Sequence, residues 1–307
     1  MTAVTAKNIV KHYGTKKEKI EALSGISFEV NKGELFGIIG PDGAGKTSLF
    51  RILTTLLLAD EGDAAVDGFD VVKEYKEIRN RVGYMPGKFS LYQDLTVAEN
   101  LDFFATTFNT TIEENYHLIK DIYLQIEPFK KRRAGKLSGG MKQKLALCCA
   151  LIHKPSVLFL DEPTTGVDAV SRKEFWDMLK KLKERQITIL VSTPYMNEAG
   201  LCDRIALMQS GKVLSINTPD SIIKEFKNEL FAVKAAKMLP LLNDLKNFNE
   251  AEDAYFFGAY HHVVLKHFNK ENELKNYLSK YADDQLEIKK VEPDNEDCFM
   301  ELMKNTS

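Results

Sequence analysis

Apolar positions along the first two-thirds of the chain follow two alternating patterns. Short runs rich in β-branched residues are separated by segments whose apolar residues recur at helical spacing. Three of the runs are almost continuously apolar and read "ELFGII" (34–39), "SVLFLDE" (156–162) and "ITILVST" (187–193). Strands buried on both faces have this character, so the pattern predicts a parallel sheet with helices on its faces.

Helical patterns follow two of these runs, namely "KTSLFRILTTLL" (46–57) and "AVSRKEFWDMLKKLKE" (169–184). Between about 88 and 150 the pattern is mostly helical, which predicts an inserted helical lobe. The stretch "RIALMQSGKVLSINTP" (204–219) predicts a hairpin with Ser210-Gly211 at its turn.

After about residue 218 the segments change in kind. "LFAVKAA", "KMLPLLNDLKN", "AYFFGAYHHVVLK", "ENELKNYLSKY" and "QLEIKKV" predict a strand, a helix, a pair of strands, a helix and a final strand. We therefore expect two domains, residues 1–218 and residues 219–307, of which the second is a small α+β unit.

The overall composition argues mainly against other classes of protein. The chain has 307 residues, 44% hydrophobic and 28% charged, which is enough for a sizeable core. Lysine and arginine number 42 against 44 acidic residues, a net charge of −2 that argues against a chain built mainly to bind nucleic acid. No apolar run approaches the roughly 18 residues that span a bilayer, and "MTAVTAKNIVKHYG" lacks the apolar core of a signal peptide. We expect a cytosolic protein that meets a membrane only at its surface.

Cysteine and histidine do not indicate a metal site. The four cysteines show no metal-ligand spacing, and Cys148-Cys149 falls in the apolar stretch "LALCCALI", which is typical of buried thiols. His261 and His262 are neighbours on a predicted strand and are expected to point to opposite faces, whereas His267 lies roughly 20 Å further along.

A glycine-rich loop follows the first apolar run. "GPDGAGKTS" (40–48) fits the pattern G-x-x-x-x-G-K-[ST], with a predicted strand before it and a predicted helix after it. Glycines at Gly40, Gly43 and Gly45 allow backbone conformations in which successive N–H groups converge on a polyphosphate, and the helix N-terminus adds its dipole. In such a loop Lys46 reaches the β- and γ-phosphates, and the Thr47 hydroxyl ligates Mg²⁺.

Two acidic residues end the second apolar run, in "VLFLDEP" (157–163). A carboxylate that ends a buried strand beside a phosphate loop is placed to hold Mg²⁺ through water, which is the role predicted for Asp161. Glu162 is then placed to polarise an attacking water and is the candidate catalytic residue.

"LSGGMKQK" (137–144) is a third motif. Ser138, two glycines and a helical run present a hydroxyl and N–H groups at a helix start, which is a second end suited to an anion. Alone this signal is weak, but it becomes specific together with the phosphate loop and the acidic pair.

With these three motifs the chain resembles the nucleotide-binding subunit of an ABC transporter. The resemblance implies a cassette with a parallel core sheet, an antiparallel β subdomain and an inserted helical lobe, and its tail resembles the C-terminal domain of drug-efflux-type exporter ATPases. It assigns ATP binding to Tyr13, which stacks on adenine, and to Gly40, Pro41, Asp42, Gly43, Ala44, Gly45, Lys46, Thr47 and Ser48. It assigns the signature to Leu137, Ser138, Gly139, Gly140 and Met141, and the D-loop to "TGVD" (165–168), ending at Asp168.

The resemblance also implies an assembly. Two cassettes pack head to tail, and each ATP lies between the phosphate loop of one and the signature of the other. "KFSLYQDLTVAENL" (88–101) is implied to help dock a cytoplasmic helix of a transmembrane permease, the alternative being an ordinary surface of the helical lobe. Whether Phe89, Leu91 and Tyr92 are exposed there is a question for the structure. The resemblance favours export over import, with the chain peripheral on the cytoplasmic face of the membrane.

Two positions depart from the family pattern. The family has a histidine after the last core strand, which contacts the γ-phosphate, and here that residue is Pro194. It has a glutamine after "GYMP", which helps to position Mg²⁺ and water, and here that residue is Gly87. Gly87 has no side chain, and Pro194 offers neither a side-chain donor nor a backbone N–H. Gln93 lies six residues further on and is not assigned as a substitute.

These departures lead to a hypothesis of asymmetry. The chain is expected to bind ATP and Mg²⁺ well and to hydrolyse ATP slowly at its own phosphate loop, because losing one preorganised transition-state contact typically costs about 10²–10³ in rate. Its intact signature can still serve the ATP of a partner, so we expect a heterodimer with a complete second cassette rather than a homodimer.

Two other functions share these motifs. An ABC protein that acts on ribosomes or DNA usually carries two cassettes with a charged linker, or long coiled-coil insertions, and this sequence shows neither. A regulatory clamp that binds ATP without turnover differs from the transport subunit only in whether the partner's site turns over.

Overall fold

The computed structural model describes residues 1–14, 19–88, 90–282 and 285–304. The chain forms two compact units, of which the first ends at Pro219 and the second begins at Asp220. Each unit has its own hydrophobic core, and the two are described separately below. No helix in the described part of the chain is both long enough and apolar enough to cross a membrane.

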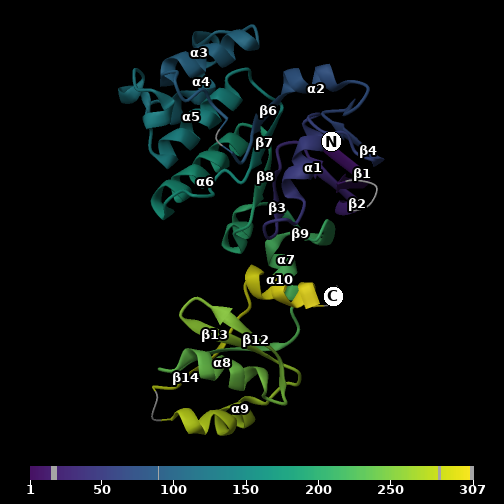
Figure 1. Ribbon diagram of the computed structural model, residues 1–307, viewed down its shortest axis with the longest axis vertical. Coiled ribbons are helices and arrows are strands. Elements are labelled where there is room, and N and C mark those ends of the chain that lie inside the picture. Colours follow the sequence, from purple (N-terminus) through teal and green to yellow (C-terminus); the bar gives the residue numbers. More distant parts are fainter. Residues whose placement is uncertain (15–18, 89, 283–284, 305–307) are drawn as a thin grey trace. The chain divides into compact units, whose positions relative to one another are not determined.

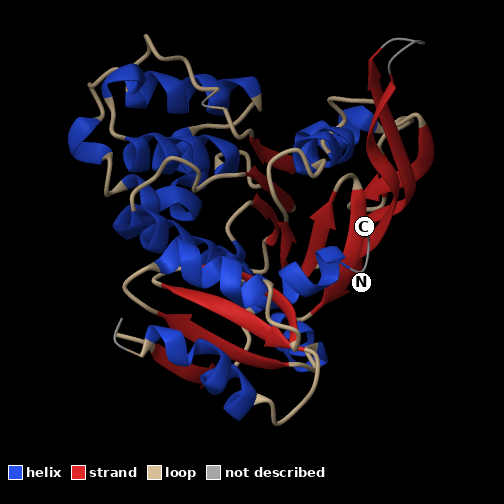
Figure 2. Cartoon of the chain, turned by 60° about the horizontal axis from the view of Figure 1, so that its bottom comes forward, coloured by secondary structure: helices blue, strands red, loops and turns tan. Residues whose placement is uncertain are grey.

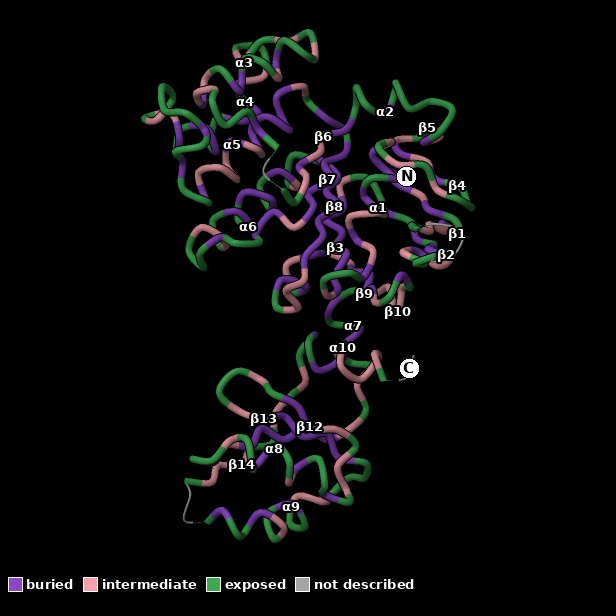
Figure 3. The backbone as a smooth tube through the Cα atoms, in the orientation of Figure 1, coloured by how far each residue is buried: buried purple, intermediate pink, exposed green. Residues whose placement is uncertain are grey.

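A six-stranded sheet forms the centre of the first unit (Figure 1). Its strands pair in parallel except at one edge, where the last strand is antiparallel. Every residue of three adjacent inner strands, at 35–39, 188–193 and 157–161, is buried (Figure 3), as expected for runs that are apolar on both faces. In spatial order the strands are β10 (Lys212–Asn217), β9 (Arg204–Gln209), β3 (Leu35–Ile39), β8 (Thr188–Thr193), β7 (Val157–Asp161) and β6 (Val82–Met85).

An antiparallel sheet and one helix cover one face of this central sheet. The helix α1 (Lys46–Leu53) shares a single core cluster with residues of both sheets. The antiparallel strands, in spatial order, are β2 (Lys19–Asn31), β1 (Thr2–Gly14), β4 (Glu61–Val66) and β5 (Phe69–Asp70), and α2 (Tyr75–Arg81) follows them along the chain. On the opposite side, α6 (Ala169–Glu184) packs on β8.

The predicted helical lobe is present and forms a cluster of helices at one side of the first unit (Figure 2). Its helices are α3 (Val97–Thr107), α4 (Ile112–Tyr123) and α5 (Gly139–Leu151), with short 3₁₀ turns η1 (Glu127–Phe129) and η2 (Ala134–Lys136). Threonines cap the first two helices, and the carboxylates of Glu99 and Glu114 accept hydrogen bonds from the backbone N–H groups of these threonines. Such reciprocal caps satisfy N–H groups that a helix start leaves free.

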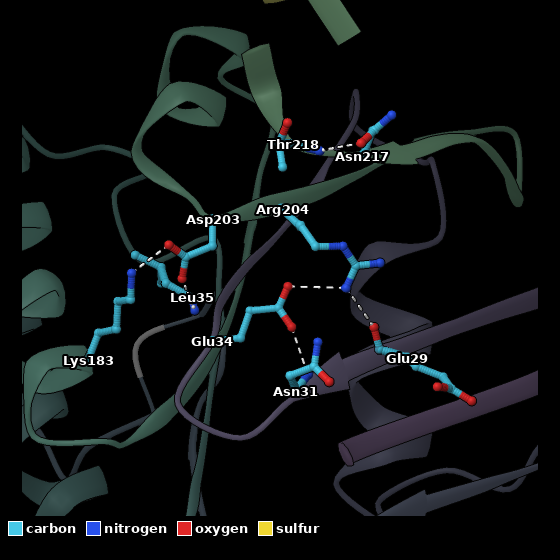
Figure 4. Close-up of polar contacts among 9 residues, drawn as sticks. All are labelled: Glu29, Asn31, Glu34, Leu35, Lys183, Asp203, Arg204, Asn217 and Thr218. Carbon is cyan, nitrogen blue, oxygen red and sulfur yellow. Dashed lines mark hydrogen bonds and ion pairs between the residues drawn. The ribbon is translucent and has the colours of Figure 1, made fainter. Parts of the chain in front are cut away.

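Polar contacts close the end of the central sheet where β3 and β9 begin (Figure 4). Arg204 donates to Glu34 at 3.2 Å, and Glu34 accepts from the backbone N–H of Asn31 at 2.6 Å. Asp203 accepts from the backbone N–H of Leu35 at 2.9 Å and pairs with Lys183 of α6. The charged groups at this end are thus engaged with each other.

The second unit has the order strand, helix, strand, strand, helix, strand. Its elements are β11 (Glu229–Lys234), α8 (Met238–Lys246), β12 (Ala251–Phe257), β13 (Tyr260–Leu265), α9 (Glu271–Tyr277) with η4 (Leu278–Tyr281), and β14 (Glu287–Val291). The sheet order is β12-β13-β11-β14 with every pair antiparallel, which is a ferredoxin-like arrangement. α7 (Pro219–Glu225) precedes it, and α10 (Asn295–Lys304) follows it.

Some predicted elements differ from those observed. The helix predicted over 46–57 ends at Leu53, because Thr55 takes a left-handed backbone conformation (φ 64°) that an α-helix does not continue. The sequence pattern also did not predict α10, whose residue Met300 packs against Leu230 and its neighbours on the second unit's sheet. The hairpin of β9 and β10 has Ser210-Gly211 at its turn, as predicted.

The cysteines and the paired histidines lie in the interior. All four cysteines are free and buried, and burial raises the pKa of the Cys148 thiol. His261 and His262 engage different elements: His261 lies 2.7 Å from the carbonyl oxygen of Met238, and His262 lies 2.7 Å from Asp297. These contacts agree with the prediction that the two rings point to opposite faces.

Asp297 should be a stability determinant of the second unit. It is 1% exposed and accepts hydrogen bonds from Tyr255 at 2.8 Å and from the backbone N–H of Asp294 at 2.8 Å, besides its contact with His262. Asp297→Ala leaves these buried groups unpaired, and we expect a loss of about 3 kcal/mol.

Hydrogen exchange of the full chain measures this loss, as roughly hundredfold faster exchange in β12 and β13. Glu292→Ala, at an exposed position on the preceding segment, is the control and should leave exchange unchanged. Equal exchange in the Asp297 variant and the wild type would contradict the assignment.

Candidate nucleotide site

The glycine-rich loop joins β3 to α1 at the carboxyl end of the central sheet. Gly45, immediately before α1, has φ 102°, and a Cβ there would lie 2.5 Å from the carbonyl oxygen of Ala22. Glycine is therefore required both by the backbone conformation and by the close approach of β2. The loop encloses a hollow of about 160 Å³ lined by Ala22, Gly43, Gly45, Lys46, Thr47, Ser48 and Glu162.

Lys46 is the cation of this hollow. Its side chain is 3% exposed, and Nζ donates to the carbonyl oxygens of Gly40 at 2.8 Å and Pro41 at 3.0 Å. The same atom lies 3.1 Å from Oε1 of Glu162. A buried ammonium needs such acceptors, because leaving it unpaired is costly. The contact also joins two residues that the sequence places 116 positions apart.

Asp161 and Glu162 lie where β7 ends, next to β8. Asp161 is 1% exposed and stands opposite Ser192 in the parallel register of the two strands. Ser192 donates from Oγ to Asp161 Oδ1 at 2.7 Å. Glu162 has a left-handed backbone (φ 50°), and its N–H donates to Ser192 at Oγ (3.0 Å) and at the carbonyl oxygen (3.1 Å).

A buried polar cluster holds the segment that follows β8. Glu198 is 2% exposed and accepts from the hydroxyls of Thr164 at 2.9 Å and Thr193 at 2.5 Å. Arg172 lies 3.7 Å from the same carboxylate and stacks 4.0 Å from the ring of Tyr195. The carboxylate thus has two hydroxyl donors, from the turn after β7 and from β8, and a guanidinium of α6 nearby, and these contacts hold the chain beyond Thr193.

The two positions that depart from the family pattern both border this site. A Cβ at Gly87 would lie 3.1 Å from the carbonyl oxygen of Asp161 and 3.8 Å from its Oδ2. Pro194 directly follows Thr193, whose carbonyl oxygen accepts from the N–H of Gly40 at 3.2 Å. A side chain at position 87 would therefore reach the Asp161 carboxyl group, and position 194 adjoins the start of the phosphate loop.

The remaining predicted nucleotide residues lie around the same loop. Thr47 and Ser48 line the hollow, and Asp42 is exposed. Tyr13, at the end of β1, is 39% exposed, and its hydroxyl is 3.1 Å from Oγ of Ser48. An exposed aromatic ring beside the loop is available for stacking.

The signature residues lie at the start of α5, with Leu137 just before the cap residue, and they do not line the hollow. Ser138 is the N-cap, and its hydroxyl accepts from the backbone N–H of Met141 at 3.4 Å, so one N–H group of the predicted anion-binding end has a partner within the chain. Asp168 caps α6 by accepting from Ser171 N–H at 3.0 Å, which lowers the pKa of its carboxyl group. Gly140 lies against Ser171 of α6, and a Cβ at Gly139 would lie 3.5 Å from the carbonyl oxygen of Gly166, so the signature lies beside the D-loop.

Several residues of this region were not found by reasoning from the sequence. Ser192, Glu198 and Arg172 belong to no motif recognised in the sequence. Ser192 could have been found by aligning the ends of the predicted parallel strands, which places it opposite Asp161.

Burial, and then the nearby charge of Asp161, raise the pKa of Tyr84 on β6 to about 12, which keeps its phenol protonated.

A larger apolar groove of about 440 Å³ lies between the helical lobe and the central sheet. It includes Tyr84, Met85, Leu91, Phe104 and Phe108. Leu91 is buried and is therefore not exposed on the surface of the lobe. Its side chain lines this groove instead. Tyr92 is 49% exposed, whereas Phe89 lies outside the described residues.

Comparison with known proteins places these features in context. A family model described as ABC transporter matches residues 23–165. The probable multidrug ABC transporter ATP-binding protein YbhF of Escherichia coli K12 is 36% identical over 288 residues, which is 92% of this chain and 49% of that protein. The chain thus spans about half the length of YbhF. The ABC transporter ATP-binding protein NatA of Bacillus subtilis is 35% identical over 230 residues, covering 74% of this chain and 94% of NatA.

Solved structures show the same fold. The cassette MJ0796, in a dimeric post-hydrolysis state bound to ADP and phosphate, aligns with a TM-score of 0.63 and 28% identity. The alignment covers 70% of this chain and 98% of that structure. The matching fold is therefore a P-loop ATPase cassette, with a parallel core sheet as predicted.

The two signature glycines should respond differently to alanine. A Cβ at Gly140 would lie 2.8 Å from the Cβ of Ser171, whereas at Gly139 the nearest atom is 3.5 Å away. Gly140→Ala is expected to destabilise the first unit by about 1–3 kcal/mol through overpacking. Gly139→Ala should be neutral or stabilising, because alanine favours helix by up to about 1 kcal/mol.

Denaturant unfolding followed by the single tryptophan, Trp176 of α6, measures both changes. Ser171→Gly should restore the Gly140→Ala variant by removing the clashing atom. Similar losses in the two alanine variants would show that the packing of Gly140 on Ser171 is not the cause.

Proposed function

Because this chain belongs to the ABC transporter family, we propose that it is an ATP-binding subunit that powers a membrane transporter, with ATP as its nucleotide and Mg²⁺ as its metal. The observation that carries the proposal is the gathering of Lys46 and Glu162 around one hollow at the carboxyl end of the sheet, next to Asp161. Backbone N–H groups of the loop and the start of α1 suit phosphate groups, and Lys46 supplies the compensating charge.

The oxygen donors of the site fit a hard divalent cation. The Thr47 hydroxyl and the Asp161 carboxylate, the latter through water, are the residues expected to hold Mg²⁺. When bound, Mg²⁺ neutralises charge that develops on the phosphates. Glu162 orients and polarises water as the general base, for which its carboxylate must leave Lys46 once a nucleotide occupies the hollow.

Hydrolysis at this phosphate loop is proposed to be slow. In ATPases of this kind, catalysis depends mostly on preorganised groups that contact the phosphates, the metal and water. Gly87 adjoins Asp161 and Pro194 adjoins the start of the phosphate loop, and neither can donate a hydrogen bond from a side chain. The positions are therefore suitable for catalytic contacts, but the residues that occupy them have no side chain that could make such a contact.

The intact signature supports an asymmetric pair. In the signature, Leu137 to Met141, the serine caps α5 and the two glycines are its first residues, which gives a helix start suited to phosphate. We propose that this end serves the ATP of a second, complete cassette in a heterodimer. That partner's ATP would then be the one hydrolysed rapidly.

The apolar groove is proposed to receive a cytoplasmic helix of the transmembrane permease. Aromatic side chains such as Phe104 and Phe108 line it, and the implied docking segment contributes Ser90 and Leu91. An amphipathic helix in a groove is a common mode of recognition. Export is the proposed direction, supported by relatives named for multidrug transport and for linearmycin resistance.

Restoring the two missing side chains tests the slow site. Gly87→Gln with Pro194→His is expected to raise single-turnover ATP hydrolysis by about 10²-fold, and the gains need not be multiplicative because the residues act as a unit. Nucleotide binding measured in parallel should change little. Adding Glu162→Gln to the restored variant is the control and should remove the gain. Ordinary family rates in the wild type, or no gain in the restored variant, would refute the proposal.

Two substitutions in the assembled transporter test the asymmetry. Ser138→Arg blocks the signature that serves the partner's ATP and is expected to lower steady-state hydrolysis by at least about 10²-fold. Glu162→Gln removes only this chain's own base and should leave most of the turnover. In a homodimer with two active sites both substitutions would abolish turnover, and that result would contradict the heterodimer.

A further inference from the structure

We infer that Ser192 is a positioning residue for the metal-binding side of the site, holding Asp161 and Glu162 in place through one buried hydroxyl. The inference rests on the proposed function, since it concerns how this chain prepares Asp161 for Mg²⁺. Ser192 does not line the hollow and acts through its two acidic neighbours.

The hydroxyl of Ser192 makes two hydrogen bonds of opposite sense. It donates to Asp161 Oδ1 at 2.7 Å and accepts from the Glu162 N–H at 3.0 Å. The residue is 0% exposed, so water does not compete for either bond. One hydroxyl therefore sets the rotation of the Asp161 carboxylate and the position of the Glu162 backbone together.

The geometry leaves the second oxygen of Asp161 on the side that faces Gly87. A Cβ at Gly87 would lie 3.8 Å from Asp161 Oδ2, and the chain has no side chain there to orient that oxygen. Among the residues that the structure describes, Ser192 is thus the one whose side chain donates a hydrogen bond to this carboxylate. Its contribution should be larger than in a site where a glutamine also borders the carboxylate.

The same hydroxyl also supports an uncommon backbone conformation. Glu162 has φ 50°, a region that non-glycine residues adopt at a cost of the order of 1–3 kcal/mol. Its N–H is captured by Ser192 at both Oγ and the carbonyl oxygen. From this turn the Glu162 carboxylate lies 3.1 Å from Lys46 Nζ.

The parallel register explains why a serine at this position can act on both acids. Asp161 pairs with Ser192 across β7 and β8, so the serine side chain lies beside the carboxylate. Partners that orient a metal-binding group typically contribute about 10–100-fold to metal affinity. We expect the same range for the Ser192 hydroxyl.

The test is a Mg²⁺ titration of nucleotide binding to the full chain, using a fluorescent ATP analogue. Ser192→Ala is expected to raise the Mg²⁺ concentration at half effect by about 10–100-fold. Binding of the analogue in EDTA should be unchanged, because the loop and Lys46 are intact. A merely structural role would weaken binding in EDTA as well.

Thr188→Val is the matched control. Thr188 lies at the other end of β8, is 2% exposed, and its hydroxyl accepts from the N–H of Gly33 at 3.0 Å. This variant removes a buried hydroxyl from the same strand and should keep the Mg²⁺ dependence of the wild type. If Ser192→Ala does not fold, Ser192→Cys is tested in its place. The Mg²⁺ concentration at half effect should then rise by less than is expected for alanine, because the thiol can still donate weakly.

The outcomes separate the inference from the proposed function. If the wild type does not bind the nucleotide, the proposed function fails. If the wild type binds with a Mg²⁺ effect and Ser192→Ala shows the same Mg²⁺ dependence, only the inference fails. An equal shift in Thr188→Val, or a Ser192→Cys variant identical to the wild type, overturns it too.

Discussion

The parallel pairing of β3, β8 and β7 is the constraint on which the nucleotide site depends. In this register Ile39 lies opposite Thr193, and Asp161 lies opposite Ser192. A slip of one residue would turn every side chain of a strand to the other face. The pairing is held by apolar residues on both faces of the sheet, so the chemistry at its carboxyl end is positioned by a core that contains little polar material.

Charged groups at this end are tolerated because each has partners. Lys46 and Asp161 are both nearly inaccessible, and an isolated charge in such a place would be strongly unfavourable. Carbonyl oxygens of the loop and Glu162 surround the ammonium, and the Ser192 hydroxyl contacts the carboxylate. The Glu198 carboxylate follows the same rule with its threonine hydroxyls and Arg172. These contacts link the phosphate loop, β7, β8 and α6 at one end of the sheet.

Gly87 and Pro194 are unusual because the chain belongs to the ABC transporter family, whose pattern has glutamine and histidine at these positions. A glycine and a proline at loop positions would be unremarked in most proteins. Here Gly87 adjoins Asp161, and Pro194 follows the strand that holds Ser192 and Thr193. Both therefore border the residues that are proposed to position metal and water. The phosphate-loop and signature motifs are both complete in the sequence, so the effect proposed for these two departures is on turnover and not on binding.

The sequence alone determined the kinds of elements in the first unit and the local motifs, because these depend on short-range patterns. The glycine-rich loop between strand and helix and the limits of α6 follow from neighbouring residues in the chain. Tertiary structure decided the contacts between distant segments. Ser192 meets Asp161 across 31 positions, Lys46 meets Glu162, and Leu91 turns inward to line a groove. No local pattern encodes these contacts, since they arise only when strands pair in register and the helical lobe packs beside the sheet.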